Sequence, residues 1–212
     1  KRETIANKGI WRGKKMYILN AWNVEGVQYS EPKLKLQGIE AVRSSTPKAC
    51  RENIKKCLSI IMNGTQEELH EFIKNFREEF LILPFEDVAF PRGVKGMYNY
   101  NKNKSMLYDK GSPVHVKGSL IFNHLLKKYD IKNVPAIQDG DKIRFAYLKT
   151  PNPVHESVIA VPDELPKELQ FIDKYIDREI QFNKSFLDPI KSITEVINWS
   201  TEQTSTLEDF FG

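Results

Sequence analysis

A long β-hairpin between Gly13 and Gly38 is the feature that most constrains the fold of this chain. The cluster Asn23–Gly26 near its middle favours a tight turn, so the flanking segments are expected to pair as antiparallel strands. Lysines stand at the base of both strands, and aromatic side chains lie among them: Tyr17, Trp22 and Tyr29. This combination of cations and aromatic rings favours a nucleic acid as partner over an acidic membrane.

The length and composition predict a globular protein. With 212 residues, of which 40% are hydrophobic, the chain is long enough for one large domain or two small ones. No stretch approaches the roughly 20 apolar residues of a membrane span, and no signal peptide is visible, so a soluble protein inside the cell is expected. Cys50 and Cys57 are predicted to be reduced thiols on one helix, as in a cytosolic protein. Since Lys1 is not a methionine, we expect the chain to be the downstream part of something longer.

Charge is distributed unevenly along the chain. Residues 1–56 contain 13 basic and 5 acidic side chains, a net charge of +8, whereas residues 163–212 contain 5 basic and 11 acidic ones, a net charge of −6. The first quarter should therefore be attracted to phosphates and the last quarter repelled by them.

Two helices are expected after the hairpin. Thr46 is the predicted N-cap of the first, with Pro47 at its first position. This helix should end at Asn63-Gly64, and its buried positions follow helical spacing: Ile54, Cys57, Leu58 and Ile61. Residues 65–68 (TQEE) match a capping box and predict the start of an antiparallel second helix.

The rest of the chain predicts mixed structure. A third helix should start at Ser112-Pro113 after a polar surface loop over 97–111, and alternation over 142–148 predicts a strand that could pair with 157–161. From 168 to about 197 the helical period returns, with Pro189 predicting two helices or a kink. The fold class is thus α+β: an N-terminal β-hairpin followed by a mainly helical region with a small β element.

The basic residues around the hairpin are candidate DNA contacts. Lys14 and Lys15 face Lys33 and Lys35 on the paired strand, which concentrates positive charge, although a solvated pair of strands is the simpler alternative. Backbone amides at the helix start could hold a further phosphate. The predicted DNA-binding residues are Lys14, Lys15, Tyr17, Lys35, Arg43, Ser44, Ser45, Thr46 and Lys48.

The C-terminal tail suggests a docking peptide. Residues 200–206 form a small polar linker, and an apolar triad follows at i, i+3 and i+4: Leu207, Phe210 and Phe211. Such a triad suits a hydrophobic pocket on a partner, although the terminus could also fold back on its own core.

No local motif predicts an active site. The four histidines and two cysteines lack the spacing of a metal site, and Asp139-Gly140-Asp141 favours a β-turn over a pair of metal ligands. A phosphate-binding glycine loop, a nucleophile elbow and a catalytic triad are also missing from the sequence. We therefore expect no catalytic residue, bound metal or cofactor in this chain.

Several motifs together resemble B-family replicative DNA polymerases of the T-even bacteriophage type, in their C-terminal part. The motifs occur in the family's order and cover essentially the whole chain: GKKMY (13–17), KLQGIE (35–40), SSTP (44–47), PVHVKG (113–118) with FN (122–123), and LEDFF (207–211).

The resemblance implies a division of the chain and a set of roles. Residues 1–43 would be the end of the palm, with minor-groove contacts near the primer terminus from Lys14, Lys15 and Tyr17. Met16 stands where the family has an arginine, and Arg43 matches a basic position that faces DNA. Residues 44–199 would be the thumb, which wraps the primer-template duplex, and residues 200–212 a flexible tail that docks into a sliding clamp through Leu207, Phe210 and Phe211.

The resemblance also implies what lies elsewhere. The Mg²⁺-binding aspartates of the palm and the exonuclease domain would be upstream, so this fragment would be inactive as a nucleotidyltransferase by itself and would act with the rest of the polymerase in the infected bacterial host. Two alternatives stay open: a separate, non-enzymatic accessory protein that bridges DNA and clamp, or the C-terminal piece of a split polymerase.

Overall fold

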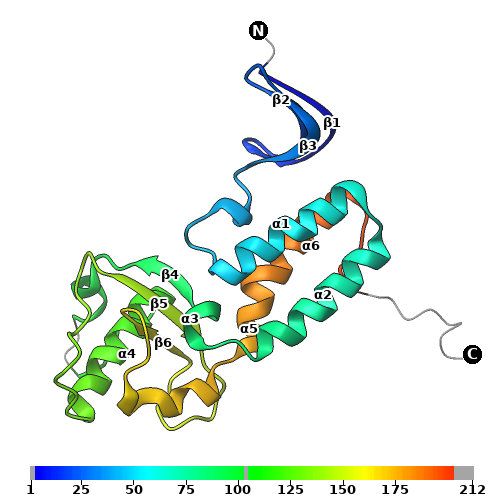
Figure 1. Ribbon diagram of the computed structural model, residues 1–212. Helices are drawn as coiled ribbons and strands as arrows, with labels where there is room; N and C mark the ends of the chain where they lie inside the picture. The colour runs from blue at the N-terminus through cyan, green and yellow to red at the C-terminus, as the bar shows by residue number, and fades with distance from the viewer. Residues whose placement is uncertain (1–2, 103–104, 203–212) are drawn as a thin grey trace, which may run out of the picture. The chain divides into compact units, whose positions relative to one another are not determined.

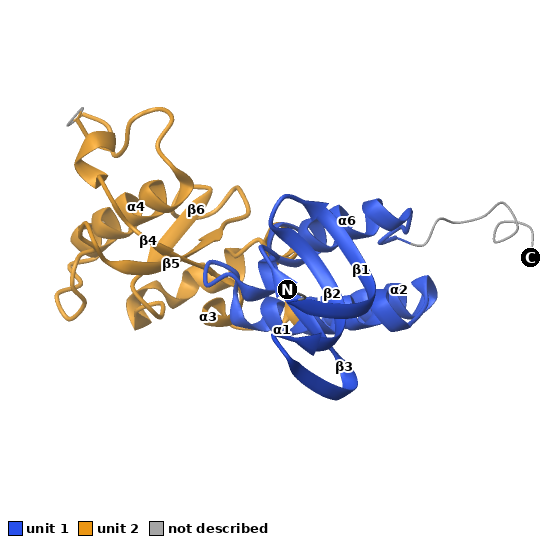
Figure 2. Cartoon of the chain, turned by 90° about the horizontal axis from the view of Figure 1, so that it is seen from above, with its two compact units in different colours: residues 1–79, 183–212 blue, residues 80–182 orange. Residues whose placement is uncertain are grey.

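The computed structural model describes residues 3–102 and 105–202, which fold as two compact units. The first unit combines residues 1–79 with 183–212, and the second spans residues 80–182 (Figure 2). Each unit contains a three-stranded antiparallel sheet and helices, which confirms the predicted α+β class. The hairpin and the first helix fall in the same unit, so the palm and thumb boundary implied after residue 43 stays a prediction.

The sheet of the first unit has the order β1-β2-β3 (Figure 1). The predicted hairpin is present as β2 (Met16–Val24) and β3 (Val27–Gln37), and the backbone amide of Gly26 donates a 3.0 Å hydrogen bond to Asn23 Oδ1 in the turn. An unpredicted third strand, β1 (Thr4–Gly13), pairs with β2. Consequently Lys14 and Lys15 lie in the turn between β1 and β2, where a strand position was predicted.

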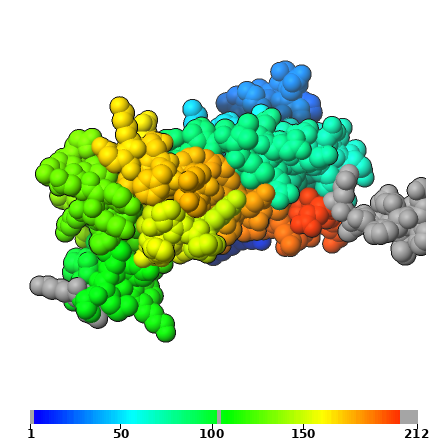
Figure 3. Space-filling view, turned by 90° about the horizontal axis from the view of Figure 1, so that it is seen from below, coloured from blue at the N-terminus to red at the C-terminus, as the bar shows by residue number. Residues whose placement is uncertain are grey.

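The two predicted helices follow as α1 (Lys48–Asn63) and α2 (Gln66–Leu81). The capping box is confirmed, because the Glu68 amide donates to Thr65 Oγ1 at 3.3 Å and the Thr65 amide donates to Glu68 Oε2 at 3.1 Å. One side of α2 is exposed to solvent, as the teal surface in Figure 3 shows.

The predicted N-cap of α1 is wrong by one residue. Pro47, with φ −52° and ψ 145°, is the N-cap and has no side-chain hydrogen bond to the helix. Its extended ψ places it outside the helix, because a residue at the first helical position would have helical φ and ψ. Thr46 lies before it, buried, and its amide donates to the Arg43 carbonyl at 3.2 Å in the turn that leads to α1.

The C-terminal helical run is divided into two, but the break falls at Ile176 and Asp177 and not at Pro189, from which it was predicted. It comprises a 3₁₀ helix, η3 (Lys167–Tyr175), then α5 (Arg178–Phe182), a π-helical turn η4 (Asn183–Leu187), and α6 (Asp188–Thr194), with the short 3₁₀ helix η5 (Glu195–Ile197) at its end. Pro189 stands in the first turn of α6, which continues directly from η4: Leu187, the residue before α6, has helical φ and ψ of −69° and −48°.

The segment 183–194 completes the core of the first unit. The Phe186 ring meets Phe76 of α2 edge-on, with 4.7 Å between centroids, and Ser185 Oγ lies 3.1 Å from the Cys50 sulfur of α1. Both cysteines are buried and free, as predicted. Burial raises the pKa of the Cys50 thiol to about 12, against the opposing effect of the Ser185 hydrogen bond, so the thiol is protonated at neutral pH.

The second unit is built on the sheet β4 (Phe90–Gly93), β5 (Lys142–Tyr147) and β6 (Val158–Val161). The pairing of β5 with β6 was predicted, whereas β4 was not. Helix α4 (Val114–Lys128) lies on β6, and a Cβ added at Gly118 would stand 2.9 Å from the Ala160 nitrogen. The short helices α3 (Phe85–Val88) and η2 (Met97–Tyr100) complete the unit.

Two further findings concern the described residues. None of their helices is long and apolar enough to cross a membrane. Within 3–102 and 105–202, no three or more histidine, cysteine or acidic side chains are grouped so that they could hold a metal ion.

Candidate nucleic-acid interface

The turn between β1 and β2 presents Lys14 and Lys15 to solvent. Both side chains are exposed, and among the described residues neither has a hydrogen-bonding or ion-pairing partner. Lys15 has a positive φ of 60°, which this tight turn requires. Gly38, at the end of β3, also has a positive φ of 67°, and a Cβ added there would collide with the Lys15 carbonyl oxygen. The lysine turn therefore lies close to the residue that follows β3, and this approach requires a glycine at position 38.

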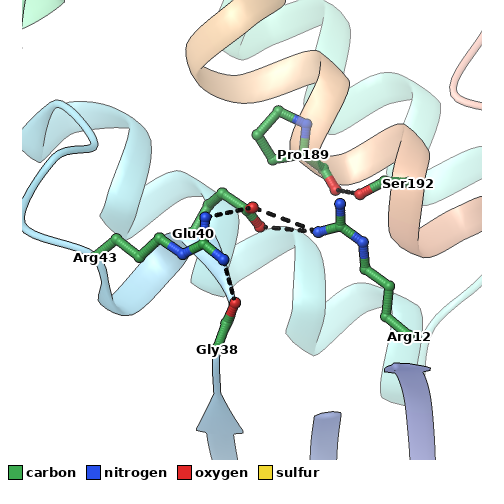
Figure 4. A network of polar contacts seen from close by, with 6 residues as sticks. All are labelled: Arg12, Gly38, Glu40, Arg43, Pro189 and Ser192. Carbon is green, nitrogen blue, oxygen red and sulfur yellow. Dashed lines mark hydrogen bonds and ion pairs between the residues drawn. The ribbon is translucent and has the colours of Figure 1, made fainter. Parts of the chain in front are cut away.

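Arg43 is tied to the same corner of the unit. Its guanidinium donates to the Gly38 carbonyl at 2.8 Å and pairs with Glu40 at 3.3 Å (Figure 4). Glu40, on the 3₁₀ helix η1 (Glu40–Val42), also accepts a 3.2 Å hydrogen bond from Arg12 of β1. One carboxylate thus serves two guanidinium groups, and the Arg43 side chain stays 43% exposed.

Figure 4 also shows α6 close to this network. There the Ser192 hydroxyl donates a 2.7 Å hydrogen bond to the Pro189 carbonyl. This contact belongs to the helix itself. In the network of Figure 4, Glu40 is therefore the acidic partner of both arginines.

The remaining predicted hairpin residues are more constrained. The Lys35 ammonium donates a 2.7 Å hydrogen bond to the Thr4 hydroxyl. Tyr17 is half-buried and stands between Trp11 of β1 and Gln37 of β3 in the register of the sheet. Both residues therefore keep only part of their surface for a ligand.

The predicted contacts before α1 differ in exposure. Ser44 and Lys48 are exposed and Ser45 is half-buried, but only 6% of Thr46 is accessible. The first turn of α1 has no acidic side chain, so Lys48 adds its charge to the positive end of the helix dipole. Hence Thr46 contributes to the backbone of this turn, while the exposed side chains around it could approach a phosphate.

Three side chains of the first unit that make long-range contacts were missed by the sequence analysis: Arg12, Glu40 and Lys8. The Lys8 ammonium donates to the carbonyls of Met62 at 2.8 Å and Ile61 at 3.3 Å, at the last turn of α1. No local motif could have identified these contacts, because the partners are 28 to 54 residues apart in the sequence.

A separate polar cluster lies in the second unit. Lys117 of α4 pairs with Glu156 at 3.3 Å, and the Tyr108 hydroxyl donates to the same carboxylate at 3.0 Å. Partial burial opposes the charge of Lys117, but its contacts with Tyr108 and Glu156 outweigh burial and raise the pKa of the amine. Partial burial, followed by repulsion from Arg92, lowers the pKa of His115. The lysine of this cluster is thus compensated, unlike those of the β1–β2 turn.

The three predicted clamp anchors lie outside the described residues. The structure therefore does not bear on Leu207, Phe210 or Phe211.

Comparison with known proteins identifies relatives over nearly the whole chain. No model of a protein family matches the sequence. The chain is 31% identical over 212 residues to the DNA-directed DNA polymerase of Enterobacteria phage T4, and 32% identical over 214 residues to that of Escherichia phage RB69. Each alignment covers 96% of this chain but 22% of the relative, so the chain spans about a fifth of the length of these curated proteins. These matches confirm the resemblance to phage DNA polymerases that the motifs predicted.

Proposed function

We propose that this chain, a relative of the T-even-type phage DNA polymerases, grips the primer-template duplex as part of a DNA-directed DNA polymerase. The observation that carries the proposal is the exposed Lys14–Lys15 turn, held in place by Gly38 beside the Arg43 guanidinium. A turn at the end of a sheet can approach a groove, where its two ammonium groups would reach phosphate oxygens and release counterions.

Neighbouring groups extend this surface. Lys48, the exposed Ser44 and the free amides at the start of α1 would hold further phosphates. Tyr17 and Lys35 would contribute their accessible edges. The contacts are to phosphate and sugar, so the binding would depend on salt far more than on DNA sequence.

The chemistry would be completed by another part of the polymerase. Transfer of a deoxynucleotide to the primer 3′ end would use Mg²⁺ held by palm aspartates outside this chain, in the cytoplasm of an infected host cell. In this assignment residues 1–43 are the end of the palm, 44–199 the thumb and 200–212 the tether. The chain by itself would bind DNA without extending it.

The duplex contact is tested by reversing the charge of the lysine turn. The double variant Lys14→Glu/Lys15→Glu should lower duplex affinity about 100-fold at low salt and should reduce the slope of log K against log salt by about 2. The matched control is Lys127→Glu/Lys128→Glu, which reverses an exposed lysine pair at the end of α4. Equal losses in both variants, or none in the first, would contradict the assignment.

The tether is tested separately. Replacing Leu207, Phe210 and Phe211 by alanine should abolish binding of the chain to a sliding clamp and leave duplex affinity unchanged, since the apolar anchors take no part in phosphate contacts. Surface plasmon resonance with immobilised clamp measures the first quantity. An undiminished clamp affinity would remove the tail from the proposal.

A further inference from the structure

The sheet β1–β3 has two faces with different surroundings. One face is turned toward the helices of its unit, with Ile10, Ile18 and Asn20 only 6%, 1% and 3% exposed. Asn20 Nδ2 on this face donates a 3.3 Å hydrogen bond to Asn63 Oδ1 at the end of α1. The opposite face, which we call the outer face, contains two ladder rows: Gly9, Leu19 and Lys35, then Trp11, Tyr17 and Gln37.

The side chain of Trp11 reaches over Gly9 on the outer face. Its indole covers Gly9, because a Cβ added at Gly9 would stand 2.6 Å from Trp11 Cη2 and 2.8 Å from Leu19 Cδ2. Only a glycine leaves room for the ring in this position. Trp11 is nevertheless 62% exposed. The indole is thus in contact with the sheet at Gly9, while most of its surface is open to solvent.

Positive charge surrounds the exposed ring. Lys35 stands in the row beside that of Trp11, and Lys14 follows Trp11 by three residues, in the turn after β1. Neither of the two rows contains an acidic side chain. A purely apolar partner would gain nothing from these ammonium groups, whereas a ligand that combines flat rings with phosphates matches both features.

We propose that Trp11 is a stacking platform for unpaired DNA bases, a contact that rests on the proposed function and extends it from duplex to single-stranded DNA. A base inside a duplex has both of its faces stacked on neighbours and cannot cover the indole. An unpaired base can do so, while Lys14, Lys15 and Lys35 neutralise its flanking phosphates. The ligand class is therefore single-stranded DNA, bound without strong sequence preference.

The experiment measures binding of the full 212-residue chain to an oligothymidylate of about 12 nucleotides by tryptophan fluorescence and by anisotropy of a labelled oligonucleotide. Trp11→Leu should lower the affinity about 5- to 150-fold and remove most of the fluorescence quenching, leaving the signal of Trp22 and Trp199. Trp11→Phe should retain most of the affinity, because phenylalanine still presents a ring face. Tyr98→Leu is the matched control, since Tyr98 is 73% exposed in the second unit.

Two further measurements separate this site from the duplex contact and from a folding defect. Trp11→Leu should leave the affinity for a covalently closed duplex unchanged, and it should keep the salt slope for the oligonucleotide, because stacking releases no counterions. Charge reversal at Lys14 and Lys15 should change both the affinity for the closed duplex and the salt slope for the oligonucleotide.

The stacking site is overturned if Trp11→Leu binds the oligonucleotide as the wild type does. It is also overturned if Trp11→Leu loses affinity for oligonucleotide and closed duplex to the same extent, or if the oligonucleotide does not quench the fluorescence of Trp11. The lysine variant could bind the closed duplex as the wild type does, while Trp11→Leu still binds the oligonucleotide weakly. That result would contradict the proposed duplex contact and would support the stacking site.

Discussion

The two three-stranded antiparallel sheets of this protein differ in how they are covered. In β4–β6 the strands have 4, 6 and 4 residues, and all four residues of β6 are buried. In β1–β3 the strands have 10, 9 and 11 residues, and the outer face is exposed at Trp11. The short sheet serves as a packing layer for α4, whereas the long sheet combines a packed face with a surface that is open to a ligand.

A glycine next to each sheet has a decisive position, but for different reasons. Gly118 lets the helix α4 approach the backbone of β6, so its role is packing inside the second unit. Gly38 takes a left-handed conformation beside the Lys15 carbonyl, so its role is to position a surface turn. The difference predicts that substitutions will affect stability in the first case and DNA binding in the second.

The largest effect is expected at Gly118. Gly118→Ala places a methyl group against strand backbone, which cannot move aside as a flexible side chain can, and should destabilise the protein by about 3 kcal/mol. The control is Gly93→Ala in β4, where nothing lies within 4 Å of an added Cβ and a change within about 0.5 kcal/mol is expected. Urea unfolding measures the stability of both variants. Equal stabilities of Gly118→Ala and Gly93→Ala would mean that α4 is not in close contact with the backbone of β6.

A smaller effect on stability, with a clear effect on binding, is expected at Gly38. Gly38→Ala should destabilise by about 2 kcal/mol because its φ of 67° disfavours a side chain, and it should weaken duplex binding by displacing the lysine turn. Gly26→Ala in the β2–β3 turn is the matched control: its φ of 93° is equally strained, but no atom lies within 4 Å. If both variants weaken duplex binding equally, the position of the lysine turn is not the cause.

An effect on stability smaller than that of Gly38→Ala is expected at Glu40. Glu40→Gln should cost about 1 kcal/mol of stability, since its ion pairs with Arg12 and Arg43 are partly exposed, and should tighten duplex binding by releasing both guanidinium groups. Glu156→Gln in the second unit, which removes a comparable partner of Lys117, should leave duplex binding unchanged. Filter binding at two salt concentrations measures this contrast, and weaker duplex binding by Glu40→Gln would refute it.

The smallest effect concerns pH and the covered sheet. The centroid of the His115 ring on α4 lies 6.3 Å from that of the Phe145 ring on β5. Partial burial and the charge of Arg92 lower the pKa of His115 in the folded protein. The unfolded chain, with a histidine pKa near 6.5, then binds more protons, so this contribution to stability is complete above pH 6.5 and is lost as the pH falls.

The measurement is the free energy of unfolding between pH 7.5 and about 5, where one such group can change stability by at most about 1.4 kcal/mol per pH unit. His115→Gln should reduce the slope, and Arg92→Gln should reduce it in part. An identical slope in wild type and His115→Gln would contradict the assignment.

Much of this fold could be predicted from local sequence signals. The β2–β3 turn, the capping box at Thr65 and Glu68, and the pairing of β5 with β6 all depend on residues close together in the chain. Strand β1 could not be predicted in the same way, because most of its residues are exposed and its apolar side chains do not alternate regularly. The strand β4, with a proline and a glycine among its four residues, has a composition that disfavours a strand.

The candidate site could be predicted only in part for a related reason. The sequence locates Lys14, Lys15 and Arg43, but Glu40, the partner of Arg43, also binds Arg12 across 28 positions, and Lys35 reaches Thr4 across 31 positions. A list of charges along the chain does not distinguish a cation that already has a partner from one that does not. The structure makes this distinction: Arg43 and Lys35 have partners, whereas Lys14 and Lys15 have none among the described residues.

The ammonium of Lys8 has a mechanical consequence for this turn. It joins β1 to the last carbonyls of α1, five residues before the strand reaches Gly13. If the lysine turn binds DNA as proposed, a force on it would pass along β1 and through Lys8 to the C-terminal end of α1, so the turn is anchored to a helix and is not a free arm.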